Sequence, residues 1–271
     1  MIREPAVAGL FYPAESAALR QAVGAFLRAP EAPAMAGRPK ALIAPHAGYI
    51  YSGAVAGAAF AQLGPFAATI RRVVLLGPAH RVRLRGLALP EAERFATPLG
   101  EVAVDPEAVS ALADLPQVSV NGAAHALEHA LEVQLPFLQS ALESFALVPL
   151  AVGDARAEEI AEVLDLLWGG SETLIVVSSD LSHYLSYEAA QRADAETLSR
   201  ILDGRLLDSF EQACGALPIN GLLLAARRHG LIPKLVARCN SGDTGGDRQK
   251  VVGYAAIEFL EGPDPRPGAV T

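Results

Sequence analysis

Three histidines and one cysteine stand directly after apolar runs of this 271-residue chain, and such side chains can together bind a metal ion. KALIAPH ends on His46, RRVVLLGPAH on His80, TLIVVSSDLSH on His183 and PKLVARC on Cys239. Runs of Val, Ile and Leu that stop at Gly, Pro or Ser are typical of buried strands in an α/β sheet, whose ligands bind beyond the carboxyl ends of the strands. We therefore expect these four residues to converge at one edge of a sheet.

The segment SSDLSHY adds a carboxylate to this set. Asp180 precedes His183 by three residues, so a helical turn here would place both side chains on one face. Asp180 could then orient the imidazole or accept a proton from it. Alternatively, Ser179, Asp180 or Ser182 caps a helix. The two interpretations are compatible.

A second group of titratable residues lies in HALEHALEVQLPFL. His125, Glu128 and His129 form the HxxEH order of inverted zinc peptidases, in which both histidines bind zinc and the glutamate acts as base. The alternative is a solvated helix face with one or two residues, His129 and Glu132, reaching the rim of a pocket. The peptidase interpretation leaves the four residues at the strand ends unexplained.

The two cysteines have different sequence surroundings. Cys214 lies in LLDSFEQACGAL, which is helix-like, and we interpret it as a small core residue. Cys239 is followed by the loop sequence NSGDTGGD. This loop matches neither the P-loop nor the GxGxxG pattern, so we expect no nucleotide cofactor.

Composition and charge exclude several classes of protein. The net charge of −8 argues against a nucleic-acid binder, which needs a basic surface. No apolar stretch approaches the roughly 20 residues that cross a bilayer. The first residues, MIREPAVAGLFYP, lack the pattern of a signal peptide, so we expect a cytoplasmic protein without membrane contact.

The elements that must position these residues alternate between strands and helices. This alternation predicts one α/β domain over residues 1–271, with a mixed central sheet, helices on both faces and a frayed, disordered tail from about residue 262. We expect helices at 14–28, 53–63, 106–114, 128–143, 156–168, 187–202 and 218–230, and strands at 40–44, 72–76, 85–89, 101–104, 145–152, 173–178, 233–238 and 251–259.

Several motifs together resemble the Memo family, which includes the B component of the bacterial and archaeal AmmeMemoRadiSam system. They follow one another along the chain as REPAVAGLFYP, APHAGYIYSG, LLGPAH, FATPLGEVAVD, EHALEVQLPFL, SSDLSHY and CNSGDTGGD. The family is similar in structure to class III (LigB-like) extradiol dioxygenases, which are non-haem Fe(II) enzymes. The resemblance implies their fold, a mixed sheet flanked by helices.

The resemblance also implies roles for individual residues. It makes His46, His80 and Cys239 the metal ligands and His183, beside Asp180, the catalytic acid or base. Non-haem Fe(II) oxygenases use two histidines and one carboxylate, whereas a cysteine would stand here at the carboxylate's place. A thiolate is anionic but softer, so we expect iron or copper, with zinc as an alternative. Extradiol cleavage therefore does not follow from the fold.

Two functions follow from this resemblance. The first is a metal-binding protein with a dioxygenase-like site of two histidines and one cysteine, performing redox or metal-dependent chemistry within the AmmeMemoRadiSam system. The second is an accessory protein with a vestigial site that partners a radical SAM enzyme and the A component of the same system. Neither interpretation names a small-molecule substrate.

Overall fold

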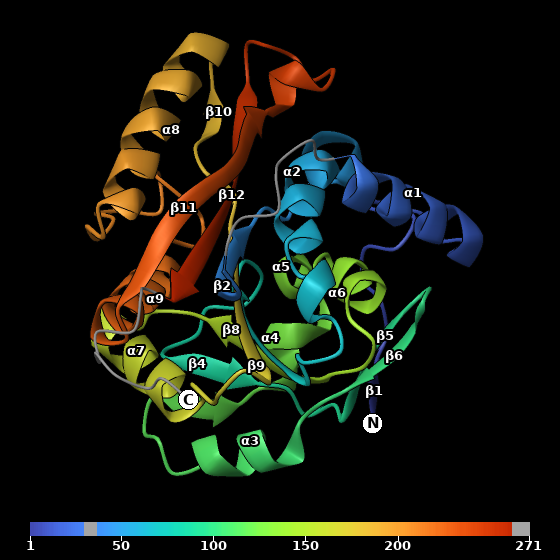
Figure 1. Ribbon diagram of the computed structural model, residues 1–271, viewed down its shortest axis with the longest axis vertical. Coiled ribbons are helices and arrows are strands. Elements are labelled where there is room, and N and C mark those ends of the chain that lie inside the picture. The colour runs from blue at the N-terminus through green and yellow to red at the C-terminus, as the bar shows by residue number, and fades with distance from the viewer. Residues whose placement is uncertain (30–36, 262–271) are drawn as a thin grey trace, which may run out of the picture.

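A nine-stranded mixed sheet forms the centre of the molecule (Figure 1). The computed structural model describes residues 1–29 and 37–261. The strands follow the order β10 (His183–Leu185), β12 (Val251–Glu261), β2 (Pro39–Ala44), β9 (Thr173–Ser178), β3 (Arg72–Pro78), β8 (Ala146–Val152), β4 (Leu87–Leu89) and β7 (Val118–Val120), and β11 (Leu231–Asn240) pairs with β12. A smaller sheet joins β1 (Ile2–Arg3), β5 (Arg94–Thr97) and β6 (Gly100–Ala103).

The four middle strands, β2, β9, β3 and β8, run parallel to one another. Nearly all of their residues are buried, because helices cover both faces and leave no place for the alternation of polar and apolar residues seen in half-exposed strands. Their carboxyl ends meet at one edge of the sheet. His46, His80 and Asp180 each follow such an end by two residues.

The helices divide into two layers. On one face, α1 (Ser16–Arg28), α2 (Tyr49–Ala61) and α6 (Leu135–Ala141) pack an apolar cluster against the sheet. On the other face, α3 (Pro106–Leu112), α7 (Ala157–Leu166), α8 (Tyr187–Leu202) and α9 (Ala216–Arg228) enclose a second cluster. Two short 3-10 turns, η1 (Gly64–Phe66) and η2 (Ser241–Asp243), complete the described elements. The predicted mixed α/β fold with helices on both faces is confirmed.

The helix predicted over 128–143 is interrupted. α5 (His129–Glu132) and α6 take its place, separated by a turn at Val133 and Gln134, and the short helix α4 (Gly122–Ala126) precedes them. Glu128 has an extended backbone and caps α5, with its side chain accepting the Ala130 N–H, so the helical pattern restarts at His129. Pro136 lies in the first turn of α6, where its missing N–H costs nothing. The HALEHALE segment is therefore no single helix with one continuous face.

Two further predictions concern the chain as a whole. The predicted disordered tail, 262–271, lies outside the described residues. No described helix combines the length and the apolar character required to cross a bilayer.

Candidate metal centre

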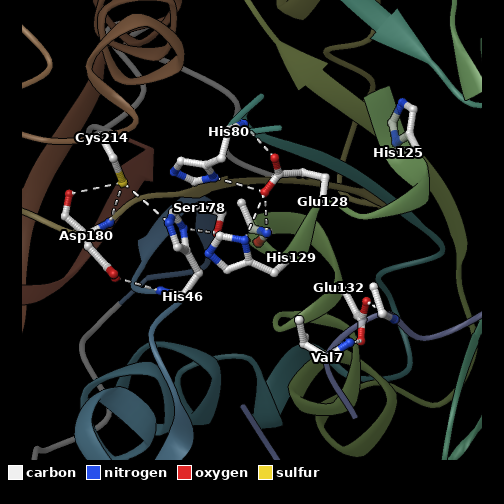
Figure 2. A network of polar contacts seen from close by, with 12 residues as sticks. Val7, His46, His80, His125, Glu128, His129, Glu132, Ser178, Asp180 and Cys214 are labelled. Carbon is white, nitrogen blue, oxygen red and sulfur yellow. Dashed lines mark hydrogen bonds and ion pairs between the residues drawn. The ribbon is translucent and has the colours of Figure 1, made fainter. Parts of the chain in front are cut away.

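Three imidazoles gather beyond the carboxyl edge of the sheet (Figure 2). His46 follows β2, His80 follows β3 and His129 begins α5. One potential ligand atom from each lies within 4.8 Å of the others. The ring centroids are 5.3 Å apart for His46 with either partner, and 4.8 Å apart for His80 and His129. Histidine nitrogens at such spacing can share one metal ion.

The buried carboxylate of Glu128 orients His80. Its Oε2 accepts the His80 backbone N–H at 2.6 Å, and its Oε1 lies 2.9 Å from His80 Nδ1. Burial by itself would raise the pKa of Glu128, but the adjacent imidazoles of His129 and His80 outweigh it and hold that pKa well below its usual value. An ionised carboxylate only accepts hydrogen bonds, so Nδ1 of His80 carries a proton, and Nε2 is the nitrogen that holds the lone pair in the neutral ring.

The hydroxyl of Ser178 orients His46 in the same sense. Ser178 Oγ donates its single proton to the carbonyl oxygen of Ala130 at 2.6 Å and accepts the Gln134 amide at 2.8 Å. It can therefore only accept from His46 Nδ1, which lies 2.9 Å away. Nδ1 of His46 is thus protonated, and Nε2 carries the lone pair.

Burial keeps His46 neutral. It is the largest cause that lowers the pKa of His46 well below its usual value, and the neighbouring His80 and His129 lower it further. Metal binding requires neutral imidazoles, so this environment favours the ligand form over the imidazolium.

His129 is the third member of the cluster, and its ring is oriented by fewer hydrogen bonds than those of His46 and His80. Its Nδ1 lies 3.3 Å from Oε1 of Glu128, yet this buried nitrogen makes no hydrogen bond with any described residue. Its ring packs against Phe11, with centroids 4.9 Å apart. An imidazole that is held by packing and close to a carboxylate, but has an unsatisfied nitrogen, is suited to a ligand that the protein itself does not provide.

The donor set fits a first-row transition metal. Imidazole nitrogen suits zinc, copper, iron and nickel, whereas magnesium and calcium prefer oxygen ligands. Backing of a ligating histidine by a carboxylate or a hydrogen-bonded hydroxyl is the usual outer arrangement of such sites. The residues present therefore fit a metal ion, and they do not distinguish among these elements.

The predicted catalytic pair is placed differently from expectation. Asp180 is fully buried, but its Oδ1 accepts the His46 backbone N–H at 2.8 Å, so it positions a metal-site residue. His183 opens the short strand β10, and the chain between the two residues is not helical, so they share no helix face. Burial raises the pKa of Asp180 to about 7 and lowers that of His183.

Two other predicted residues lie apart from the three imidazoles. Cys239, on β11, lines a cavity of about 240 Å³ together with Gln191, Asp194 and Leu198 of α8. The strand order puts β12 between β11 and β2, so this sulfur lies two strands away from the strand that leads to His46. Glu132 has no exposed surface and binds the N-terminal segment, so it does not form the rim of a pocket. His129, predicted at the rim, is part of the cluster itself.

The structure does not support the inverted zinc helix. His125 points away from the cluster (Figure 2), and its Nε2 lies 2.8 Å from the carbonyl oxygen of Ala88. The break at Glu128 separates the two histidines onto α4 and α5, so they cannot bind one ion from a common helix face.

Cys214 is the residue that the sequence interpretation missed. It was interpreted as a core residue of a helix, but it lies in a turn before α9 with its Sγ 3.3 Å from Nε2 of His46. Burial raises the pKa of its thiol to about 12, so the sulfur is protonated in this arrangement. The adjacent Gly215, which can mark a turn rather than a continuing helix, was the available signal.

Several cavities adjoin the cluster, and two of them also have His183 in their lining. The larger, about 850 Å³, is lined by His80, His183, Cys214 and the exposed Phe210, among others. The second, about 470 Å³, is lined by all three imidazoles together with His183 and Lys250, among others. Both volumes fall in the range that holds a small organic molecule.

The fold and this cluster define an α/β protein with a histidine-rich candidate metal centre at the carboxyl edge of its sheet. The chain belongs to the Memo family, since the family model described as Memo-like protein matches residues 3–258.

Relatives and a solved structure agree with this assignment. A MEMO1 family protein of Archaeoglobus fulgidus is 37% identical, over 95% of this chain and 99% of the relative. One of Sulfolobus acidocaldarius is 33% identical, over 96% and 99%. An uncharacterised protein of Escherichia coli K12 is similar in structure, with a TM-score of 0.55 and 15% identity over 82% of this chain and 99% of that one. That likeness shows the fold alone. None of these proteins bears out the predicted likeness to LigB-like dioxygenases.

Proposed function

We propose that this protein binds one transition-metal ion through His46, His80 and His129 and uses it on a small molecule in the adjoining cavities. The observation that carries the proposal is the convergence of three imidazoles, two of them oriented by Ser178 and Glu128 through Nδ1. Among the described residues, Nδ1 of His129 has no hydrogen-bond partner, and Nε2 of His46 contacts only the Cys214 sulfur, a weak donor.

The cluster supports a different ligand set from the one implied by resemblance. His46 and His80 are common to both, but His129 takes the third place and Cys239 faces another cavity. Iron, copper and zinc all remain compatible with imidazole ligands. A bound ion would supply Lewis-acid or redox chemistry to a substrate beside it.

His183 is the residue best placed to move a proton. It lines the cavities of about 850 and 470 Å³ beside the cluster. Burial, only partly offset by a hydrogen bond that the imidazole donates to the Leu181 backbone, lowers the pKa of His183, so the imidazole is neutral near pH 7 and can accept a proton from a substrate. Asp180 has a different role: its Oδ1 accepts the His46 backbone N–H and so positions that residue.

An accessory role is the second candidate. Phe210 lines the larger cavity and is 76% exposed, so an apolar side chain stands at the entrance where a partner protein could cover it. The partners implied by resemblance are a radical SAM enzyme and the A component of the same system. Co-purification of one of them with wild-type protein, and its loss with Phe210→Ser, would support this role over independent catalysis.

Metal content after native purification tests the main proposal. We expect about one equivalent of metal in the wild-type protein and its loss in His46→Ala, His80→Ala and His129→Ala. His229→Ala is the matched control, because His229 is bound to Asp165 and stacked on Trp168 away from the cluster. Wild-type loading in all three cluster variants would contradict the proposal.

A further inference from the structure

The cavity of about 850 Å³ beside the cluster has carboxylates in its wall and no basic side chain to match them. Glu196 of α8 and Glu211, in the turn before α9, both line it, and no described Lys or Arg does. Both glutamates are exposed, and within the described chain neither carboxylate forms an ion pair or accepts a hydrogen bond. Their negative charge is therefore available to a ligand.

An exposed aromatic ring accompanies these carboxylates. Phe210 is 76% exposed and lines the same cavity, next in sequence to Glu211. Pro78, Leu185 and Ala193 extend the apolar part of the wall. The face of an aromatic ring attracts a cation, and apolar surface favours hydrocarbon. A wall of this composition suits an organic cation better than an inorganic one.

A neighbouring cavity carries charges of mainly the opposite sign. It measures about 460 Å³ and shares four residues with the larger cavity, namely Pro78, Ala79, His80 and Cys214. Arg81 and Arg83 line it, together with a single carboxylate, that of Asp154. Cationic and anionic side chains are thus segregated into two cavities that meet at His80, and the larger cavity is the one that attracts positive charge.

The larger cavity also reaches the candidate metal centre. His80 is part of its wall, and so is His183 of β10, which lies beside α8 (Figure 1). Its volume falls in the range that holds a small organic molecule. A ligand whose positive end lies at the glutamates of α8 and the following turn presents the rest of its skeleton to these two imidazoles.

Resting on the proposed function, we propose that the larger cavity binds an organic ammonium ion with an apolar body. Glu196 and Glu211 attract its charge, and the ring of Phe210 contacts the ammonium group. Binding forms and breaks no covalent bond. The two carboxylates also reduce the repulsion between this cation and a metal ion held by the three imidazoles, because they add two negative charges to the same cavity.

Benzyltrimethylammonium is a suitable probe, because its nitrogen carries a permanent charge and has no lone pair for a metal. Calorimetric titration of the native protein at low ionic strength compares it with phenylmethanesulfonate, an anion of similar size. We expect the cation to bind at least tenfold more tightly than the anion. Equal or tighter binding of the sulfonate, or no binding of the cation, would overturn the inference.

The double variant Glu196→Gln/Glu211→Gln keeps the size of both side chains and removes their charge. We expect it to weaken binding of benzyltrimethylammonium about tenfold, as the loss of two exposed charge contacts allows. Glu188→Gln is the matched control, because Glu188 is exposed on the same helix outside the cavity wall. Wild-type affinity in the double variant would contradict the inference.

Phe210→Leu tests the aromatic contribution separately. Leucine keeps an apolar side chain but has no ring face, so we expect affinity for the cation to fall about two- to fivefold, the usual size of an exposed cation–π contact. Affinity equal to the wild type would remove Phe210 from the site.

Metal content of the same samples separates this inference from the proposed function. Protein that retains its metal but does not bind benzyltrimethylammonium contradicts the inference and leaves the proposed function standing. Protein that holds no metal yet binds the cation through the two glutamates contradicts the proposed function and supports the cation site.

Discussion

Glu128 and Glu132 lie four residues apart and are both buried, yet they hold different kinds of partner. Glu132 binds a cation and backbone amides of the N-terminal segment, whereas Glu128 binds the His80 imidazole of the candidate metal centre and lies 3.3 Å from that of His129. Figure 2 shows the two carboxylates directed to opposite sides of the α5 turn. The comparison separates a carboxylate that anchors the chain from one that prepares a site for a ligand.

Both carboxylate oxygens of Glu132 accept hydrogen bonds from other residues of the protein. It pairs with the buried Arg3 and accepts the backbone N–H groups of Ala6 and Val7 at 2.8 and 3.0 Å. The Tyr12 hydroxyl donates to it at 2.5 Å. With every lone pair occupied, this carboxylate offers nothing to a substrate or a metal, and its role is to hold residues 3–12 against α5.

The partners of Glu128 leave chemistry available. Its oxygens fix His80 and approach His129, while the second nitrogen of His80 stays free. Burial and charge alone therefore do not identify a functional carboxylate. The two differ in the groups that donate hydrogen bonds to them: those of Glu132 have no further ligand to bind, whereas those of Glu128 include an imidazole that can bind a metal.

The largest expected effect is on stability, from Glu132→Gln. The substitution leaves the Arg3 charge buried without an ionised partner, so we expect the free energy of unfolding to fall by about 3–5 kcal/mol in urea titration. Glu143→Gln is the matched control, because Glu143 pairs with Arg71 at 3.8 Å on the surface and should change stability by no more than about 1 kcal/mol. Equal effects of the two changes would remove the distinction drawn for Glu132.

The next effect is a loss of stability in acid that comes from His125. Burial, the largest cause, lowers the pKa of His125 from 6.5 to about 4. Between these values the unfolded chain binds more protons, so stability is retained above pH 6.5 and is lost as the pH falls toward 4. The difference between these two pKa values corresponds to roughly 3 kcal/mol of unfolding free energy at pH 4.

Urea titration at pH 7 and pH 4 isolates this contribution when wild type is compared with His125→Gln. The variant should be less sensitive to acid by about that amount. The same comparison for His229→Gln, an exposed histidine, should show little difference. If the His125→Gln variant loses as much stability between pH 7 and pH 4 as the wild type does, protonation of His125 is not the cause of the acid sensitivity.

The smallest expected effect concerns metal affinity, from Glu128→Gln. The amide keeps the size of the side chain but loses the charge that holds His80 Nδ1–H, so we expect zinc(II) affinity to fall 10- to 100-fold, about 1.4–2.7 kcal/mol. Competition with a chromophoric chelator measures this constant. Glu143→Gln should retain wild-type affinity, and an unchanged constant in Glu128→Gln would mean that the two buried carboxylates do not differ in function.

Most of the fold was predictable from local patterns. The strands predicted at 40–44, 72–76, 145–152 and 173–178 correspond to β2, β3, β8 and β9, because continuous apolar runs between turn residues depend on nearby sequence alone. The helix predicted at 128–143 is helical in two parts, α5 and α6, with a turn at Val133 and Gln134 between them. Pro136 has no N–H to donate to the Glu132 carbonyl oxygen, so the helix cannot continue unbroken across this point.

The candidate site was predictable only in part. His46 and His80 were identified because each stands at the end of a parallel strand. His129 was expected only at a pocket rim, and Cys214 was interpreted as core. The local sequence pattern does not predict where either side chain lies in space. Each location depends on how a turn or a short helix packs against the edge of the sheet.

The sequence by itself determined that several buried strands end together and that two histidines stand at those ends, since apolar runs and turn residues act over a few positions. Only the tertiary structure decided which other donors meet them. Cys214 and His46 are 168 residues apart along the chain, and their contact exists because α9 packs beneath the same sheet edge. The tautomers of His46 and His80 were likewise decided by Ser178 and Glu128, whose hydrogen bonds form only after the chain has folded.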